Sequence, residues 1–276
     1  MKILQLGKFF PIRGGVEKVM YDLMCGLSAQ NIDCDMLCVA QEGEPFERNL
    51  NAHARLIGTK MLCKKAGTTL SPAMVSRLRK ICNEYDIIHV HHPDPMACMA
   101  LFLSGYKGKV VLHWHSDILK QRCLLKLYLP FQHWLIQRAD RIVGTSPVYL
   151  QGSPFLEKVQ DKTVCLPIGI EEMERNTPRA NELKEEYGNR KIIFSLGRMV
   201  GYKGFRYLVE AAQLLGDDYL VVIGGSGPLR EKLEQQIHEL KLEQKVILPG
   251  RISDEDLVAY YEACRLFCMQ IGRAHV

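Results

Sequence analysis

Short apolar runs alternate with amphipathic stretches along the chain, starting close to the N-terminus. The first half carries five such runs, at residues 2–6, 34–39, 87–91, 110–113 and 142–144. The stretches between them favour helices, and one is expected over residues 16–30. Another begins at Ser71-Pro72, since serine caps a helix and proline fits its first turn. This alternation predicts parallel β-sheets that are covered by helices on both faces, an α/β fold.

A segment with few apolar residues separates the two halves of the chain. It contains Pro167, Gly169, Pro178 and Gly188. Prolines and glycines at this density are typical of a connection between domains. We therefore place a first domain at residues 1–175, a linker at 176–190 and a second domain at 191–270.

The second half repeats the alternating pattern. Strands are expected at residues 192–196, 220–223, 246–248 and 266–268. The helix between the second and third of them carries an apolar stripe at helical spacing: Leu229, Leu233, Ile237 and Leu240. Ser253 and Asp256 predict a capped start for the last helix. Both domains are thus expected to be doubly wound and Rossmann-like, the second one incomplete.

The last residues, 271–276, fit neither a strand nor a helix. They read Ile-Gly-Arg-Ala-His-Val, which is the translation of ATCGGAAGAGCACACGTC, a string that resembles a common sequencing adapter. We therefore expect native sequence to end near Gln270 and the remainder to be a non-native tail. The same codons followed by a stop in an independent clone of the locus would contradict this.

Composition narrows the class of protein. With 276 residues, 47% of them hydrophobic, the chain is long enough for two small domains with ordinary cores. The net charge of +5 is mild and no block of like charges appears, so a nucleic-acid partner is not expected. Ten cysteines without a Cys-x-x-Cys pair indicate buried free thiols. Since no signal peptide or long apolar segment is present, we expect a cytoplasmic protein.

The most informative motif is a glycine-rich turn between Ser195 and Gly204, which follows an apolar strand and opens a helix. Such a turn directs unpaired backbone N–H groups and the positive end of a helix dipole at a ligand, which favours a phosphate. Arg198 and Lys203 add two positive charges within the turn. The sequence therefore predicts a diphosphate site, and a diphosphate suggests a nucleotide.

Two further glycine turns follow predicted strands. Gly14-Gly15 comes after the first strand, where ligands of open α/β sheets lie, although a tight turn explains it as well. The segment from Gly224 to Pro228 also has the shape of a phosphate or sugar site. Its glycines do not complete the Gly-x-Gly-x-x-Gly fingerprint of dinucleotide enzymes, because Arg230 occupies the last position.

Histidines gather at the ends of two neighbouring strands. They are His89, His91 and His92 on one strand and His113 and His115 on or just after the next. Zinc is the tempting interpretation, but no third partner stands at metal-ligand spacing, so hydrogen-bonded structural histidines are favoured and no metal is expected. We expect His115 to touch substrate, and His89 to be structural.

The segment from Lys120 to Arg141 is basic and amphipathic. Its apolar stripe comprises Leu124, Tyr128, Phe131 and Leu135. Such a helix can lie on an anionic bilayer, which leaves peripheral contact at the inner face of the plasma membrane open. Packing of the stripe against the protein's own sheet is the favoured interpretation.

The order of these pieces resembles the retaining glycosyltransferases of family 4, which have the GT-B architecture of two facing Rossmann-like domains. The motifs that carry the resemblance are Gly14 to Glu17, His115, Gly197-Arg198 with Lys203-Gly204, Gly224 to Pro228, and Pro249 to Arg251. Together they cover most of the chain up to Gln270. The resemblance implies transfer of a hexosyl group from a UDP- or GDP-sugar to a glycan or lipid-linked acceptor, in cell-surface polysaccharide synthesis.

The resemblance also assigns roles to residues. Arg198 and Lys203 would hold the diphosphate and stabilise the leaving group without a metal or other cofactor, and His115 would contact the donor sugar. Backbone groups of Gly14, Gly15, Gly225, Gly227, Arg251 and Ile252 would bind the donor. Candidates on the acceptor side are Glu17, His92 and Asp117. The family's Glu-x7-Glu segment would lie beyond this chain, so we expect the 276-residue polypeptide itself to be inactive.

Two other classes of function stay open at this point. One is a non-catalytic module that binds sugar nucleotides or polysaccharide. The other is a nicotinamide oxidoreductase, which the incomplete glycine fingerprint disfavours.

Overall fold

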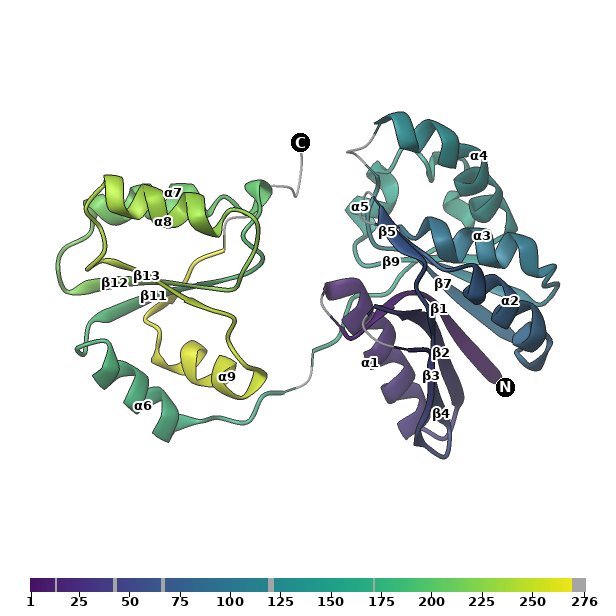
Figure 1. The fold of residues 1–276 in the computed structure, drawn as a ribbon, viewed down its shortest axis with the longest axis horizontal. Helices are drawn as coiled ribbons and strands as arrows, with labels where there is room; N and C mark the ends of the chain where they lie inside the picture. The colour runs from purple at the N-terminus through teal and green to yellow at the C-terminus, as the bar shows by residue number, and fades with distance from the viewer. Residues whose placement is uncertain (13, 42–43, 66–67, 119–121, 171, 270–276) are drawn as a thin grey trace. The chain divides into compact units, whose positions relative to one another are not determined.

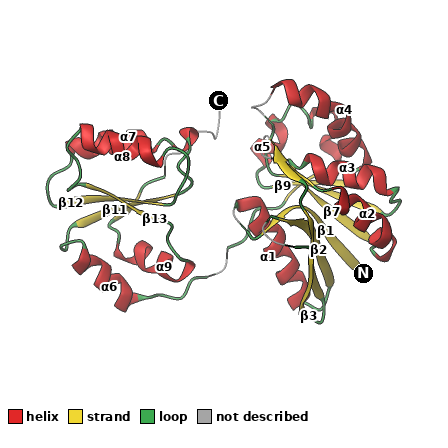
Figure 2. Cartoon of the chain, viewed as in Figure 1, coloured by secondary structure: helices red, strands yellow, loops and turns green. Residues whose placement is uncertain are grey.

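The structure is a computed structural model that describes residues 1–12, 14–41, 44–65, 68–118, 122–170 and 172–269. The chain divides into two compact units, Met1–Gly169 and Ile170–Val276 (Figure 1). Each unit is a sheet with helices on both of its faces (Figure 2). The predicted α/β fold class is therefore confirmed.

Unit 1 is built on an eight-stranded sheet with the strand order β10-β9-β8-β7-β1-β2-β4-β3. Its strands are β1 (Lys2–Phe10), β2 (Asp33–Ala40), β3 (Phe46–Asn51), β4 (Ala54–Lys60), β7 (Ile87–His92), β8 (Lys109–Trp114), β9 (Arg141–Gly144) and β10 (Thr163–Cys165). A separate hairpin pairs β5 (Cys63–Lys65) with β6 (Thr68–Leu70). Because β7 lies between β1 and β8 and all three run parallel, their carboxyl ends meet at one edge of the sheet.

The described residues of unit 1 form five α-helices between the strands. They are α1 (Gly15–Ala29), α2 (Pro72–Ile81), α3 (Pro95–Ser104), α4 (Arg122–Arg138) and α5 (Pro147–Gly152), with short 3₁₀ segments at Cys82–Glu84 and Glu157–Lys162. One core joins α2, α3 and α4 to one face of the sheet, and a second core joins α1 to the other face. The predicted cap of α2 is present, since the Ser71 side chain accepts a hydrogen bond from the Met74 backbone N–H.

Unit 2 has a four-stranded parallel sheet with the order β13-β12-β11-β14. Its strands are β11 (Lys191–Leu196), β12 (Tyr219–Gly224), β13 (Val246–Gly250) and β14 (Leu266–Phe267). Its helices are α6 (Thr177–Glu186), α7 (Phe205–Ala211), α8 (Arg230–Glu239) and α9 (Asp254–Ala263), with 3₁₀ turns at Gly201–Lys203 and Ala212–Leu214. α7 and α8 cover one face and α6 and α9 the other (Figure 1).

The predicted linker differs from the structure. Residues 177–186 form α6, which packs against α9 through Ala180 and Leu183, whereas the boundary between the units lies at Gly169 and Ile170. Pro178 misled the sequence analysis, because proline in the first turn of a helix is compatible with that helix. The change from one unit to the other coincides with Pro167 and Gly169 instead. The predicted tail at 271–276 lies outside the described residues.

The edge of the unit 1 sheet was not among the predicted strands. β3 reads Phe-Glu-Arg-Asn-Leu-Asn and is almost entirely exposed, so it has no apolar run to reveal it. It pairs antiparallel with β4, whose buried positions Leu56 and Ile57 carry the signal that should have been read. An edge strand is hydrogen-bonded to another strand on one side only. Because the side chains of β3 are also largely exposed to solvent, its sequence can be polar.

The amphipathic α4 packs its stripe into the core. Tyr128 and Leu135 are buried and Phe131 is packed beside them, as the favoured interpretation predicted, whereas the side chain of Leu124 lies outside the described residues. Leu127 is exposed on the same helix. No helix in the described part of the chain has the length and apolar character needed to cross a bilayer.

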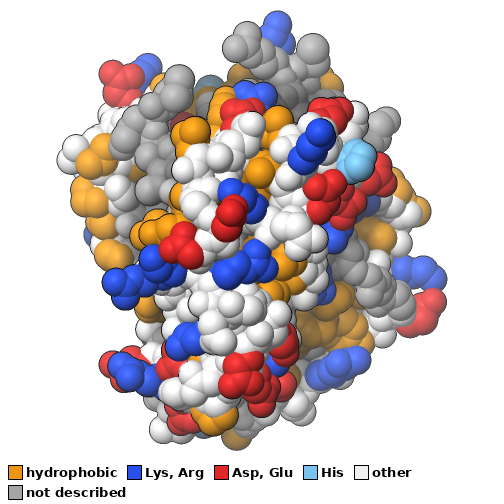
Figure 3. Space-filling model, turned by 90° about the vertical axis from the view of Figure 1, so that its left-hand side faces the viewer, with side chains coloured by type: hydrophobic (Ala, Val, Ile, Leu, Met, Phe, Trp, Pro, Cys, Tyr) orange, Lys and Arg blue, Asp and Glu red, His pale blue; other side chains and the backbone are white. Residues whose placement is uncertain are grey.

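Surface charges and thiols complete the description. On the face shown in Figure 3, cationic and anionic side chains are interspersed and not gathered by sign. None of the cysteines whose side chains are described forms a disulfide, but only four of them are buried, and Cys63 and Cys165 are exposed. The expectation of buried thiols was therefore wrong for these two, which lie on the short strands β5 and β10.

Candidate functional site

Three loops meet at the carboxyl edge of the unit 2 sheet, after β11, β12 and β13. Gly197 N–H donates to Gly224 O at 3.1 Å, and Met199 N–H donates to Ser226 O at 2.9 Å. The third loop joins through Gly225 N–H, which donates to Gly250 O at 2.6 Å. These backbone hydrogen bonds fix the three glycine-containing turns against one another.

Glycine is required at two points of this contact. Gly225 has φ +119° and Gly227 has φ +158°, values that other residues rarely adopt. A Cβ on Gly225 would overlap the backbone oxygen of Gly197, and a Cβ on Gly227 would lie 2.6 Å from Met199 O. The loops can approach this closely only because both side chains are absent.

Arg198 and Lys203 both lie on the loop after β11. Arg198 is exposed and Lys203 half-buried, with the methylene stem of Lys203 beside Gly197. Neither side chain forms an ion pair with an acidic residue within the described ranges, whereas some other cations of unit 2, such as Arg179 and Lys191, do. Two cations beside glycine turns at the end of a parallel strand form an anion-binding arrangement.

Other predicted donor residues of unit 2 lie at the same edge. Arg251 is exposed directly after β13, and the Ile252 side chain packs into the core and against Gly224. The backbone N–H of Gly225 is already bonded to Gly250, so it cannot bind a donor phosphate as predicted. The glycine at 225 is explained by its approach to Gly197.

In unit 1, Gly14 and Gly15 lie at the start of α1, after β1. Gly14 is the N-cap and Gly15 opens the helix, where a Cβ would meet nothing within 4 Å. N–H groups in the first turn of a helix have no acceptor within that helix. Glu17 is buried in the same turn, with a carboxylate oxygen close to Gly14. This helix start can bind an anion or a sugar oxygen through its backbone.

His92 is not accessible to an acceptor in this structure. It is 0% exposed, and its ring stacks on Trp114 with the centroids 3.9 Å apart and the planes inclined by 5°. Adjacent residues of a strand point to opposite faces, so His92 faces the core of α3 and α4, away from His91. The prediction of an acceptor-side role for His92 is therefore withdrawn.

Asp117 has a structural role in the loop after β8. One of its carboxylate oxygens accepts hydrogen bonds from Trp114 Nε1 at 2.8 Å and from Ser153 Oγ at 2.9 Å. Its backbone N–H donates to the hydroxyl of Tyr149. These contacts account for the aspartate without a substrate, and they hold the loop that carries His115.

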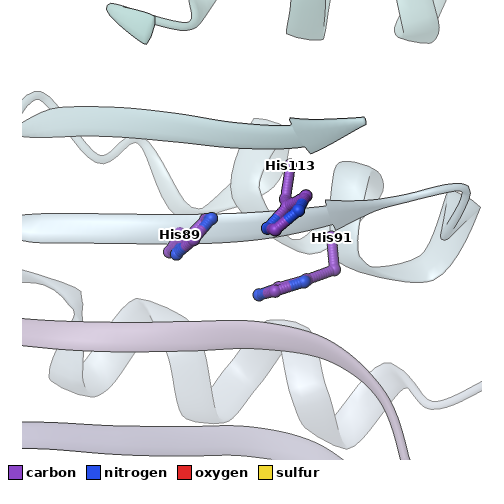
Figure 4. Close-up of side chains that lie close together, drawn as sticks. All are labelled: His89, His91 and His113. Carbon is purple, nitrogen blue, oxygen red and sulfur yellow. The ribbon is translucent and has the colours of Figure 1, made fainter. Parts of the chain in front are cut away.

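The remaining histidines lie together on the face of the unit 1 sheet that α1 covers. Nitrogens of His89, His91 and His113 lie within 4.8 Å of one another (Figure 4). The spacing along the chain offers no third partner, as stated above, but strand pairing brings a third histidine close in space.

The arrangement of these rings does not fit a preformed metal centre. A metal ligand needs a nitrogen whose lone pair is available, and one member of this cluster does not offer one. Both nitrogens of His91 have protein partners.

Burial keeps these histidines neutral. Desolvation lowers the pKa of His89 to about 3 and that of His113 to about 4. The pKa of His115 is lowered to about 3, mainly by burial and further by His113, Lys8 and His89. Lys8 itself lies within β1, at the irregularity between Leu6 and Phe9, and its ammonium group donates to Pro93 O. The sequence analysis gave no role to Lys8 or to Gln5, a polar residue inside the apolar run of β1.

The structure thus groups the candidate residues by unit. Gly14, Gly15, Glu17 and His115 lie at the carboxyl edge of the unit 1 sheet. Arg198, Lys203, Gly225, Gly227, Arg251 and Ile252 lie at the carboxyl edge of the unit 2 sheet. Parallel sheets bind their ligands at this edge.

Comparison with known families decides what these edges belong to. Residues 13–151 match the family described as Glycosyltransferase Family 4, and residues 177–275 match the glycosyl transferases group 1. The chain belongs to glycosyltransferase family 4. The second match includes α6, which agrees with placing that helix in unit 2.

Curated relatives of this family 4 glycosyltransferase transfer sugars in bacteria. The chain is 33% identical to the O-antigen chain mannosyltransferase C of Escherichia coli over 96% of its length, and it spans 71% of that protein. It is also 33% identical to the D-rhamnosyltransferase WbpZ of Pseudomonas aeruginosa, over 89% of its length, and spans 64% of that protein.

Solved structures confirm the GT-B fold. Anabaena HepE, in a crystal structure with UDP, superimposes with a TM-score of 0.72 over 97% of this chain and 73% of HepE, at 19% identity. The sucrose-phosphate synthase from Thermosynechococcus elongatus gives a TM-score of 0.73 over 97% of this chain and 75% of that enzyme, at 18% identity. Such low identity compares the fold alone. The oxidoreductase alternative is overturned by the family match.

Proposed function

We propose that this protein transfers a hexosyl group from a UDP- or GDP-sugar to a glycan or lipid-linked acceptor, with retention of the anomeric configuration, in cell-surface polysaccharide synthesis. Membership of family 4 gives the type of reaction. The relatives named for O-antigen mannosyl and D-rhamnosyl transfer support a hexose-like donor and a surface glycan as the acceptor.

The observation that carries this proposal is the pair of cations on the loop after β11. Arg198 and Lys203 stand beside turns whose glycines have no side chain to shield the backbone, and no described carboxylate neutralises either cation. A diphosphate brings the negative charge that this surface lacks. Arginine suits it because its planar fork can bind two phosphate oxygens at once.

The chemistry follows from the same charges. As the bond between the sugar and the diphosphate breaks, negative charge grows on the leaving phosphate oxygen. Cations that are already in place stabilise that charge more in the transition state than in the bound donor, which lowers the barrier. In this proposal Arg198 and Lys203 take the role that a metal ion has in other transferases, and no cofactor is needed.

In this proposal unit 1 binds the acceptor and also contributes contacts to the donor. His115 contacts the donor sugar, and Gly14 and Gly15 at the start of α1 contribute backbone N–H groups. The cationic, partly exposed α4 offers a peripheral contact for an anionic membrane that carries a lipid-linked acceptor. These roles come from the family resemblance and are parts of the proposal.

Calorimetry with UDP and GDP tests the proposal at its first step. The chain spans about two thirds of the length of its relatives, so nucleotide binding is a more direct measurement than turnover. We expect one nucleotide to bind to the 276-residue chain, and Arg198→Ala to weaken binding at least tenfold. Arg265→Ala is the matched control, because Arg265 is an exposed arginine at the opposite, amino-terminal edge of the same sheet.

The proposed site would be overturned if neither UDP nor GDP bound. It would also be overturned if Arg198→Ala bound the nucleotide as tightly as the control Arg265→Ala. Binding of a nucleotide without transfer to any acceptor by a full-length relative would favour a non-catalytic module instead.

A further inference from the structure

Gln5, His91 and His115 form a continuous chain of hydrogen bonds in unit 1. Gln5 Oε1 lies 2.7 Å from His91 Nε2, and His91 Nδ1 lies 2.9 Å from His115 Nε2. Gln5 and His91 are both 0% exposed, whereas His115 is half-buried at the carboxyl edge of the sheet. These hydrogen bonds thus run from a buried amide on β1 to an imidazole that solvent can reach.

The side-chain amide of Gln5 determines which ring nitrogens of His91 and His115 carry a hydrogen. A carbonyl oxygen only accepts, so His91 Nε2 must carry a hydrogen, and a neutral imidazole carries only one. His91 Nδ1 is then bare and accepts from His115 Nε2–H. The amide nitrogen of Gln5 donates toward Cys34 Sγ at 3.6 Å, which is consistent with this orientation of the amide.

Burial keeps both rings neutral near neutral pH by lowering the pKa of His91 and of His115, and the nearby Lys8, His89 and His113 lower both pKa values further. The one remaining nitrogen, His115 Nδ1, is therefore left without a hydrogen.

The ring of His115 is fixed on one edge and on one face. The centroids of His91 and His115 are 5.2 Å apart with planes inclined by 17°, the geometry of two rings joined edge to edge by a hydrogen bond in their plane. His113 stacks on the face of His115 at 4.0 Å and 10°. A ring held in this way cannot turn to exchange its two nitrogens.

We propose that Gln5 and His91 are positioning residues, which hold His115 as the Nε2–H tautomer so that its bare Nδ1 accepts a hydrogen bond from a hydroxyl group of the donor sugar. This inference rests on the proposed function, in which His115 contacts that sugar. A bare nitrogen attracts a hydroxyl and gives nothing to a phosphate oxygen, which only accepts at neutral pH. The tautomer therefore restricts His115 to the sugar and leaves the diphosphate to Arg198 and Lys203.

Nitrogen-15 NMR of the whole chain, labelled at histidine, tests the tautomer. Long-range proton–nitrogen spectra near neutral pH show which nitrogen of His115 carries the hydrogen, and the signal is assigned by its loss in His115→Gln. We expect Nε2–H in the wild type and in Gln5→Glu, whose carboxylate also only accepts. We expect a mixture of tautomers in Gln5→Met, which has no acceptor. Cys34→Ala, which removes the other neighbour of the amide, is the control and leaves the spectrum unchanged.

Turnover gives a second measurement, made in a form of the protein that is active. Losing one neutral hydrogen bond corresponds to about a five- to tenfold lower kcat for Gln5→Met, with unchanged affinity for UDP or GDP, and Gln5→Glu restores kcat. A hydrogen on His115 Nδ1 in the wild type, or a Gln5→Met spectrum equal to that of the wild type, overturns the inference. The wild-type spectrum decides the tautomer even where Gln5→Met does not fold.

The two proposals fail in different ways. The predicted tautomer without any nucleotide binding would overturn the proposed function and leave the hydrogen-bonded chain in place. Nucleotide binding that depends on Arg198, together with the reversed tautomer, would do the opposite.

Discussion

The two units present opposite chemistry at the same edge of the same kind of sheet. At the carboxyl edge of unit 1, side chains crowd together as buried, neutral, stacked imidazoles. At the carboxyl edge of unit 2, side chains are absent at Gly225 and Gly227, and two cations stand beside the exposed backbone. A parallel sheet fixes where a ligand binds but not what it binds, so the loops decide whether the edge recognises hydroxyl groups or phosphate.

The largest expected difference between the two units is in their stability toward acid, which should be lower for unit 1. The buried histidines of unit 1 have folded-state pKa values below the unfolded value, so they bind protons only when the unit opens. Their stabilising effect is complete above about pH 6.5 and is lost as the pH falls toward the folded values of about 3 to 4. Each such histidine then costs about 2 kcal/mol at pH 5, and several together cost more. In unit 2 the described residues include one histidine, the exposed His238.

Urea unfolding followed by tryptophan fluorescence measures this, because both tryptophans, Trp114 and Trp134, lie in unit 1. Hydrogen exchange of the β11 and β12 amides reports on unit 2. His113→Phe should remove about one histidine's share of the pH dependence, and His238→Asn none. Equal loss of both units between pH 7 and pH 5 would contradict the comparison.

The cations of unit 2 should dominate the chemical step. In a form of the protein that has measurable turnover, Arg198→Ala is expected to lower it about 10²- to 10³-fold, the size of losing one preorganised group that stabilises a developing negative charge. Lys203→Ala should act in the same direction. Arg265→Ala and Lys191→Ala change cations at the amino-terminal edge of the same sheet and should leave turnover within about twofold. Near-normal turnover in Arg198→Ala would show that another group carries the phosphate.

The absence of a side chain at Gly225 should matter as much to folding as to binding. Gly225→Ala places a Cβ on the backbone oxygen of Gly197 and forces an L-residue to φ +119°, which we expect to destabilise unit 2 by about 3 kcal/mol. Gly201→Ala is the matched control, since a Cβ there meets nothing within 4 Å. Hydrogen exchange of unit 2 and calorimetry with UDP measure both effects. A Gly225→Ala protein as stable as Gly201→Ala would exclude close contact between the loops.

The sheet and helix layers of this fold could be predicted from the sequence, because strands and helices that are buried need apolar residues at regular positions. The parallel strands 87–92, 109–114 and 191–196 each have buried residues on both faces, and taken together most of these residues are apolar, as expected of strands covered on both sides. The exposed β3 and the proline-opened α6 were missed because neither needs an apolar run.

The site was predicted in part, for a related reason. Glycines and cations in turns act locally, so the loop at 197–204 could be recognised along the chain. The histidine cluster depends on the register of β7 against β8, which pairs His91 with His113, and on the alternation of faces that sends His92 to the other side. Gln5 could have been noticed as a polar residue within the apolar β1, but its partner lies 86 residues away.

The smallest expected effect is that of changing Asp117, a polar residue of unit 1. It tests whether this side chain stabilises the fold or binds a substrate. Asp117→Asn keeps the oxygen that accepts from Trp114 and Ser153, so stability should change by less than about 0.5 kcal/mol and turnover hardly at all. Asp117→Ala removes that oxygen and should cost about 1 to 2 kcal/mol, with a shift in the fluorescence of Trp114. Thermal unfolding and tryptophan emission check both variants. A large loss of turnover in a stably folded Asp117→Asn would return Asp117 to the acceptor side, because only a role for its charge separates aspartate from asparagine there.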